Sequence, residues 1–80
     1  MRIEVQLFAS LKEALGETIS LDVPEPVTVN GLLRCFGEQH PRFQSALPAL
    51  KVAVDLEYSP ADQPIRAGQE VAIFPPVSGG

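Results

Sequence analysis

The last seven residues, Phe74-Pro75-Pro76-Val77-Ser78-Gly79-Gly80, have the composition and order best suited to chemistry. Proline donates no N–H to a sheet and favours an extended backbone, so residues 75–80 should project from a domain formed by residues 1–74. Glycine lacks a Cβ, which makes Gly79-Gly80 a thin stalk able to enter the active site of another protein. Activation of the Gly80 carboxylate, for example as a mixed anhydride, would leave an open carbonyl for attack. The segment predicts a tail that is a substrate for other enzymes, and the alternative is a frayed end that happens to finish in glycine.

The composition narrows the classes of protein to which the chain can belong. Eighty residues form one small domain, with little space for a deep catalytic cleft. The formal charge of −4 argues against nucleic acid as a partner, which normally requires a basic patch. One Cys and one His exclude an internal disulfide, a multi-Cys or multi-His metal site and an iron–sulfur cluster. No membrane-spanning run or signal peptide is recognisable, so the expected location is the cytoplasm.

The elements that must position the tail can be predicted from apolar periodicity. Alternating apolar and polar residues predict four strands, at residues 2–8, 18–23, 50–56 and 71–74. In the third of these strands Leu56 shares the core phase of Leu50, Val52 and Val54. Residues 59–69 contain two prolines and Gly68, which predicts a loop with a turn.

Two helices are expected between these strands. Ser10 followed by Glu13 fits a capping box for a short helix that ends at Gly16. The main helix should run from Val29 to about Gln39, with Thr28 as N-cap and one apolar stripe to bury. The fold class is therefore α+β, with one main helix on one face of a mixed four- to five-stranded sheet and a short extra helix.

Such a sheet leaves one face uncovered, and the strand phases predict which aromatic residues lie there. Phe8 and Phe74 fall out of the core phase of their strands, and Tyr58 follows the third strand in a polar stretch. An exposed apolar patch of this kind usually marks a partner interface. The alternative is that Phe8 packs into the core with Leu11 and Leu15, and that Phe74 caps the end of the sheet.

Along its whole length the chain resembles the small subunits of molybdopterin synthase and, more broadly, the ubiquitin-like sulfur carriers. The most specific match is the ending Gly68-Gln69-Glu70-Val71-Ala72-Ile73-Phe74-Pro75-Pro76-Val77-Ser78-Gly79-Gly80, and a second match is Phe8-Ala9-Ser10-Leu11-Lys12-Glu13 after the opening strand. The resemblance implies a β-grasp fold. It also implies that Phe8, Tyr58 and Phe74 form a docking surface, and that Pro75, Pro76, Val77 and Ser78 accompany Gly79 into a partner. One departure is Asp55, where the family often has Asn.

The resemblance also implies a function in molybdenum cofactor biosynthesis. A ubiquitin-activating-type adenylyltransferase would use ATP and Mg to adenylate Gly80, and a sulfur donor protein would then supply sulfur to form a thiocarboxylate. Within the synthase, the large subunit would receive the tail, and the pterin precursor would take the sulfur. The chain itself would bind no cofactor or metal and would be the non-catalytic, sulfur-donating subunit of a sulfurtransferase. The alternatives are a carrier for thiamine, cysteine or tRNA thiolation, or a ubiquitin-like modifier conjugated through Gly80.

The remaining reactive side chains do not form a catalytic set. Cys35 should lie on the flank of the main helix as a partly buried, inert thiol, because no neighbour in the sequence would stabilise a thiolate. His40 ends the same helix, where an imidazolium would favour the helix dipole. Ser78 has no nearby base and is interpreted as a small tail residue.

Overall fold

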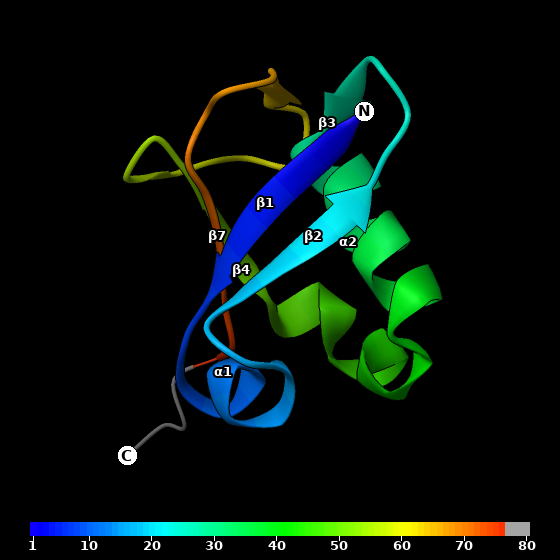
Figure 1. Cartoon of the computed structure of the whole chain (residues 1–80), viewed down its shortest axis with the longest axis vertical. Coiled ribbons are helices and arrows are strands. Elements are labelled where there is room, and N and C mark those ends of the chain that lie inside the picture. The colour runs from blue at the N-terminus through cyan, green and yellow to red at the C-terminus, as the bar shows by residue number, and fades with distance from the viewer. Residues whose placement is uncertain (77–80) are drawn as a thin grey trace.

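The computed structural model of the chain describes residues 1–76. Its main sheet has the strand order β2-β1-β7-β4-β5 (Figure 1). The parallel pair β1 (Arg2–Leu7) and β7 (Val71–Phe74) is joined on either side by antiparallel neighbours. These are β2 (Thr18–Asp22), β4 (Lys51–Val54) and, at the far edge beyond β4, β5 (Glu57–Tyr58). The prediction of a mixed sheet is confirmed, in its five-stranded form.

The main helix α2 (Val29–Gln39) has the predicted bounds. The hydroxyl oxygen of Thr28 accepts a hydrogen bond from the backbone N–H of Gly31 at 3.2 Å, which caps the first turn. Pro41 ends the α-helix, and the chain continues directly into a 3₁₀ helix, η1 (Pro41–Ala49), that the sequence did not predict. Proline at its first position suits this helix because the missing N–H would have had no helical partner there.

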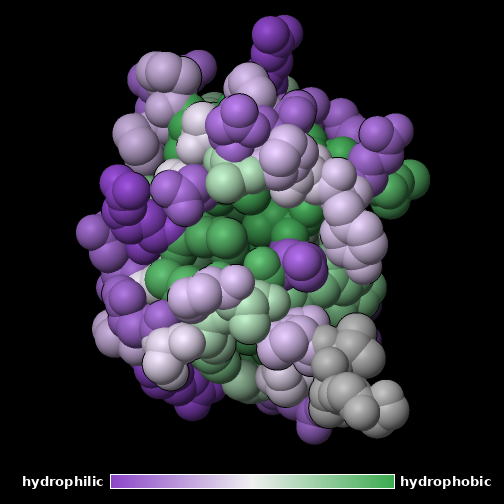
Figure 2. Space-filling model, turned by 180° about the vertical axis from the view of Figure 1, so that it is seen from behind, coloured by the Kyte–Doolittle hydropathy of each residue, from purple (hydrophilic) through white to green (hydrophobic). Residues whose placement is uncertain are grey.

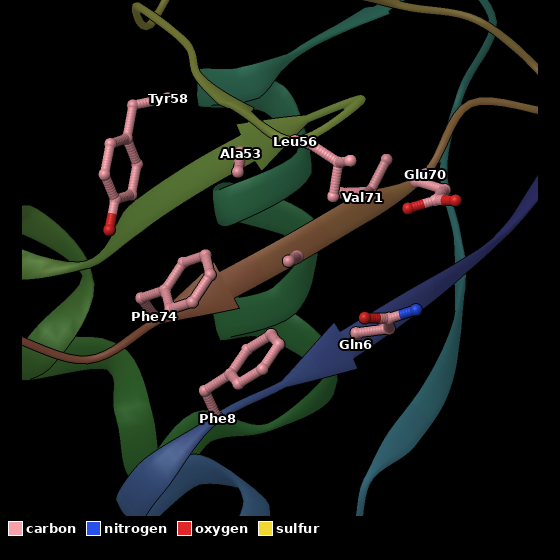
Figure 3. Close-up of a pocket in the computed structure, with 9 residues that line it drawn as sticks. Gln6, Phe8, Ala53, Leu56, Tyr58, Glu70, Val71 and Phe74 are labelled. Carbon is pink, nitrogen blue, oxygen red and sulfur yellow. The ribbon is translucent and has the colours of Figure 1, made fainter.

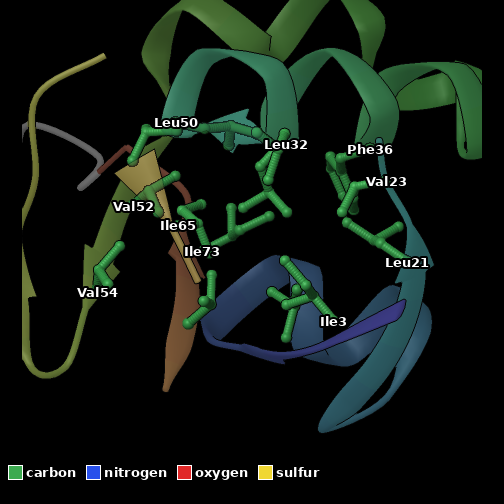
Figure 4. Packing of buried hydrophobic residues seen from close by; sticks show 14 of the residues in the cluster. Ile3, Leu21, Val23, Leu32, Phe36, Leu50, Val52, Val54, Ile65 and Ile73 are labelled. Carbon is green, nitrogen blue, oxygen red and sulfur yellow. The ribbon is translucent and has the colours of Figure 1, made fainter. Parts of the chain in front are cut away.

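One face of the sheet packs against α2, and the core lies between them (Figure 4). Leu32 and Phe36 of α2 are fully buried, as are Val5 of β1 and Ile73 of β7. Burial in β1 follows the predicted phase, since Ile3, Val5 and Leu7 are buried while the residues between them are exposed. The opposite face of the sheet carries the side chains that alternate with the buried ones along β1 and β7. Seen from behind, the molecule also has hydrophobic surface bordered by hydrophilic residues (Figure 2).

The predicted capping box at Ser10 is wrong. Helix α1 (Ala9–Leu15) begins two residues earlier than predicted, with Phe8 in the capping position and no side-chain capping bond. Phe8 keeps the extended backbone of the strand before it, with φ −131° and ψ 157°. Its ring stacks against Phe74, so packing rather than capping chemistry sets the start of the helix. The helix ends at Gly16 as predicted, where φ is +99°.

The predicted third strand is too long, and Leu56 is not in the core. Strand β4 ends at Val54, and Asp55 and Leu56 have φ of +52° and +71°. Positive φ at both central residues is the geometry of a type I′ hairpin turn, and this turn ends the alternation before Leu56. The chain then returns as the short strand β5, antiparallel to β4.

The loop predicted at residues 59–69 contains a strand as well. β6 (Pro64–Ile65) pairs with β3 (Val27–Thr28) in a separate two-stranded sheet. Two residues are too few to show a period in the sequence. Ile65 and Val27, which face each other in the register, are both buried, so hydrophobic burial holds this pair in place.

Within residues 1–76 no helix has the length and apolar character needed to cross a bilayer. In the same part of the chain, no three His, Cys, Asp or Glu side chains are grouped closely enough to hold a metal ion.

Candidate protein-docking site

Three aromatic side chains, two from strands and one that directly follows a strand, meet on the face of the sheet opposite α2. The rings of Phe8 and Phe74 are stacked with their centroids 4.5 Å apart and an interplanar angle of 12°. Tyr58 meets Phe74 edge to face, at 5.7 Å and 71°. Phe8 follows β1, Phe74 ends β7 and Tyr58 lies in β5, so the sheet itself brings them together. We call Phe8, Tyr58 and Phe74 the aromatic cluster.

The cluster borders a hollow of about 230 Å³ that we call the sheet groove (Figure 3). The groove lining from β4 and β7 includes Ala53 and Ala72, which face each other in the register, and these small side chains leave the hollow open. Apart from the Tyr58 hydroxyl, Gln6 and Glu70 supply the polar side chains of this lining within the described chain. The complete lining is Gln6, Phe8, Ala53, Leu56, Tyr58, Glu70, Val71, Ala72 and Phe74. An apolar hollow on an exposed sheet face is suited to receiving an apolar side chain of another protein.

A second hollow continues from the aromatic cluster toward the base of the tail. It shares all three aromatic residues with the sheet groove and also contains Pro75 and Pro76. Lys51 lies beside it and faces Phe74 across the β4–β7 pair. Pro75 is half-buried, whereas Pro76 is exposed. A protein seated on the aromatic cluster would therefore lie next to the start of the tail.

A hydrogen-bond network fixes the other end of the sheet groove. The carboxylate of Asp55 accepts bonds from the backbone N–H of Glu70 at 3.0 Å and from the side-chain amide of Gln69 at 2.9 Å. The N–H of Asp55 donates to the Glu70 carbonyl at 2.8 Å. The side-chain oxygen of Gln69 in turn accepts the N–H of Arg66 at 2.7 Å. The β4–β5 turn is thereby tied to the loop that leads into β7.

The structure brings together the three predicted interface residues, whereas the residues of the predicted tail chemistry lie outside the part of the chain that it describes. Phe8 is 39% exposed and Tyr58 is 72% exposed, so neither is a core residue. Their role as a partner interface stays a prediction, as do the roles of Pro75 and Pro76. The predictions for Val77, Ser78, Gly79 and Gly80 lie outside the described residues.

Leu56 is the lining residue that the sequence reasoning missed. Its position in the alternation of residues 50–56 had assigned it to the core, whereas it is 86% exposed. The available signal was Asp55, because aspartate tolerates the left-handed backbone of a turn better than most residues. Recognition of a turn at Asp55 would have ended the strand at Val54.

Cys35 lies on α2 and His40 is the capping residue between α2 and η1; neither residue lines the groove. Burial raises the pKa of the Cys35 thiol, the nearby Glu38 carboxylate raises this pKa further, and Arg34 lowers it. A raised pKa means less thiolate, which agrees with an inert thiol. The His40 ring packs at 5.3 Å from the ring of Phe36, a structural contact.

Strand order, helix cover and the exposed apolar face together define a ubiquitin-like protein of the β-grasp fold. The crystal structure of SAMP1 from Haloferax volcanii superimposes with a TM-score of 0.82 at 32% identity, covering 100% of both chains. The complex of subunits 1 and 2 of the molybdopterin-converting factor from Helicobacter pylori 26695 contains a chain of the same fold, with a TM-score of 0.66 at 22% identity and 100% coverage of both chains.

The sequence comparisons give the family. Residues 5–80 match the ThiS family, and the chain belongs to this family of sulfur carriers. A molybdopterin synthase sulfur carrier subunit from Dictyostelium discoideum is 37% identical, covering 99% of this chain and 96% of the relative. A protein of the same name from Escherichia coli (strain K12) is 35% identical, covering 98% and 99%.

Proposed function

We propose that this chain is the sulfur carrier subunit of a molybdopterin synthase and works in the cytoplasm. The observation that supports the proposal is near-full-length similarity, at 37% and 35% identity, to two proteins with that name. Residues 1–74 form the carrier domain, and residues 75–80 form the tail that carries the sulfur.

The proposed chemistry takes place at the carboxylate of Gly80, as the C-terminal residue. A ubiquitin-activating-type adenylyltransferase transfers AMP from Mg-bound ATP to this carboxylate and releases pyrophosphate. The terminal sulfur of a persulfide on a donor protein attacks the acyl carbon, and AMP leaves. A thiol then reduces the resulting acyl disulfide, which frees the thiocarboxylate. The absence of a Cβ at Gly79 and Gly80 lets the tail enter the narrow sites where these steps occur.

The docking site gives the second half of the cycle a physical basis. The aromatic cluster and the sheet groove would seat the domain on the large synthase subunit, and Pro75-Pro76 would direct the tail into that subunit. There the thiocarboxylate sulfur displaces an oxygen substituent of the pterin precursor, water hydrolyses the resulting acyl–sulfur bond, and Gly80 returns to a carboxylate. The spent carrier is then released for recharging.

Intact mass spectrometry tests the carrier function. The chain is incubated with the activating enzyme, ATP, Mg and a persulfide donor. We expect a mass increase equal to replacement of one oxygen by sulfur, and none for a variant lacking Gly80. The charged protein is then mixed with the large subunit and precursor, and the dithiolene product is measured. Charging without any dithiolene would refute the molybdopterin pathway and leave a carrier for thiamine, cysteine or tRNA thiolation.

A second candidate function is conjugation to other proteins through Gly80. It is favoured by the 33% identity to small archaeal modifier protein 1 of Haloferax volcanii, over 98% of this chain and 100% of that protein. Isopeptide adducts on lysines without a stable thiocarboxylate would support this modifier function over the carrier.

A further inference from the structure

Leu56 combines two features that the fold alone does not explain. It is a large apolar side chain that is 86% exposed, and its backbone has φ of +71°, in the left-handed region. Branched and bulky residues are disfavoured there, and Gly or Asn is the usual choice at the second central position of such a hairpin turn. A strained conformation that the surrounding structure holds in place often accompanies function.

The neighbours of Leu56 indicate which function this is. Its side chain lines the sheet groove at the end away from the tail, beside Val71 (Figure 3). The aromatic cluster lies at the other end of the same groove, so Leu56 extends the exposed apolar surface along the length of β7. The hydrogen bonds of Asp55 fix the turn that carries it, which keeps the leucine over the groove.

Charge at the border of the groove defines the chemistry of the partner. Glu70 lines the groove and is exposed. Within residues 1–76 the one ion pair found joins Arg2 and Asp22, so Glu70 is not neutralised by a neighbour in this part of the chain. A carboxylate beside an apolar hollow is complementary to an apolar side chain flanked by Lys or Arg.

We propose that Leu56 is a specificity-determining docking residue for the large synthase subunit. The large subunit places an apolar side chain between Leu56 and the aromatic cluster, with a basic residue facing Glu70. The assignment of this partner rests on the proposed function. The left-handed turn is retained because a leucine at this point contributes to binding, although it costs stability in the free protein.

The test is a pair of substitutions at position 56. Leu56→Asn favours the left-handed turn and removes the apolar side chain, so its unfolding midpoint should rise while its affinity for the large subunit falls about tenfold. Leu56→Met keeps apolar volume and backbone strain, and its affinity should stay within about threefold of the wild type. Calorimetric titration gives the affinities and thermal unfolding gives the midpoints. Glu70→Lys should slow association several-fold at low salt.

Each contrary outcome has a defined meaning. Equal affinity of the Leu56→Asn variant, with normal dithiolene formation by the wild type, overturns the role of Leu56 and leaves the proposed function intact. A wild-type chain that does not bind the large subunit overturns the assigned partner together with the proposed function. An association rate that is unchanged in the Glu70→Lys variant overturns the proposed basic residue facing Glu70.

Discussion

The turn that carries Leu56 depends on Asp55, and replacing Asp55 with alanine should destabilise the whole domain. The substitution removes the acceptors for the Glu70 N–H and the Gln69 amide. Both bonds are exposed, so each is worth about 1 kcal/mol rather than the larger value of a buried charged bond. Alanine also tolerates a φ of +52° less well than aspartate does, which adds up to about 1 kcal/mol. The expected loss is about 2–3 kcal/mol.

This loss is large compared with the stability of an 80-residue domain, which is on the order of 4–12 kcal/mol. It corresponds to a fall of about 10 °C or more in the midpoint of thermal unfolding, followed by circular dichroism. Asp55→Asn is the matched control. Asparagine keeps one acceptor oxygen for the Glu70 N–H and tolerates the left-handed backbone, so it should lose only about 1 kcal/mol. Equal midpoints for the wild type and the alanine variant would show that the network does not stabilise the turn.

Three further predictions concern the helix cap, the aromatic cluster and the thiol. Thr28→Ala should cost about 1 kcal/mol in urea unfolding, because it removes the oxygen that accepts the Gly31 N–H; an unchanged midpoint would contradict this. A double-mutant cycle with Phe8→Ala and Phe74→Ala should give a coupling of about 0.5–1.5 kcal/mol in the free energy of unfolding, because the two rings are stacked with centroids 4.5 Å apart. Losses of stability that simply add would rule out a direct contact. The raised pKa of Cys35 leaves less thiolate at a given pH. Iodoacetamide should therefore alkylate the folded chain at pH 8 more slowly than the urea-unfolded chain, and equal rates would argue against burial of the thiol.

The sequence predicted the elements whose side chains keep one period over their full length. Helix α2 has a continuous apolar stripe and a Thr cap, so both of its ends were correct. Strand β1 alternates without interruption, which fixed its buried face. Phe8 and Phe74 could be placed on the free face because each is out of phase with a well-defined core strand. Their stacking partners were not predictable, since these depend on which strands are neighbours in the sheet.

The prediction failed where backbone geometry or tertiary packing overrides the local pattern. At Leu56 the apolar alternation continues through a turn whose left-handed φ values end the strand, and Asp55 is the one residue in the sequence whose type indicates this turn. At Ser10 a capping motif is present but unused, because the Phe8 ring holds the preceding backbone against β7. The pairing of β3 with β6 joins residues 27 and 65, a contact that short-range patterns do not encode.

Positions of the lysines bear on the choice between carrier and modifier. The chain contains two lysines, Lys12 and Lys51, and both are exposed. The N-terminal ammonium donates to the Val23 carbonyl at 2.8 Å, which makes it a poorer acceptor for conjugation. Lys51 lies beside the aromatic cluster and the base of the tail, so a second copy attached there would cover the proposed docking surface. A modifier that built chains through Lys51 would therefore lose this surface, whereas a carrier would have it available each time it is released.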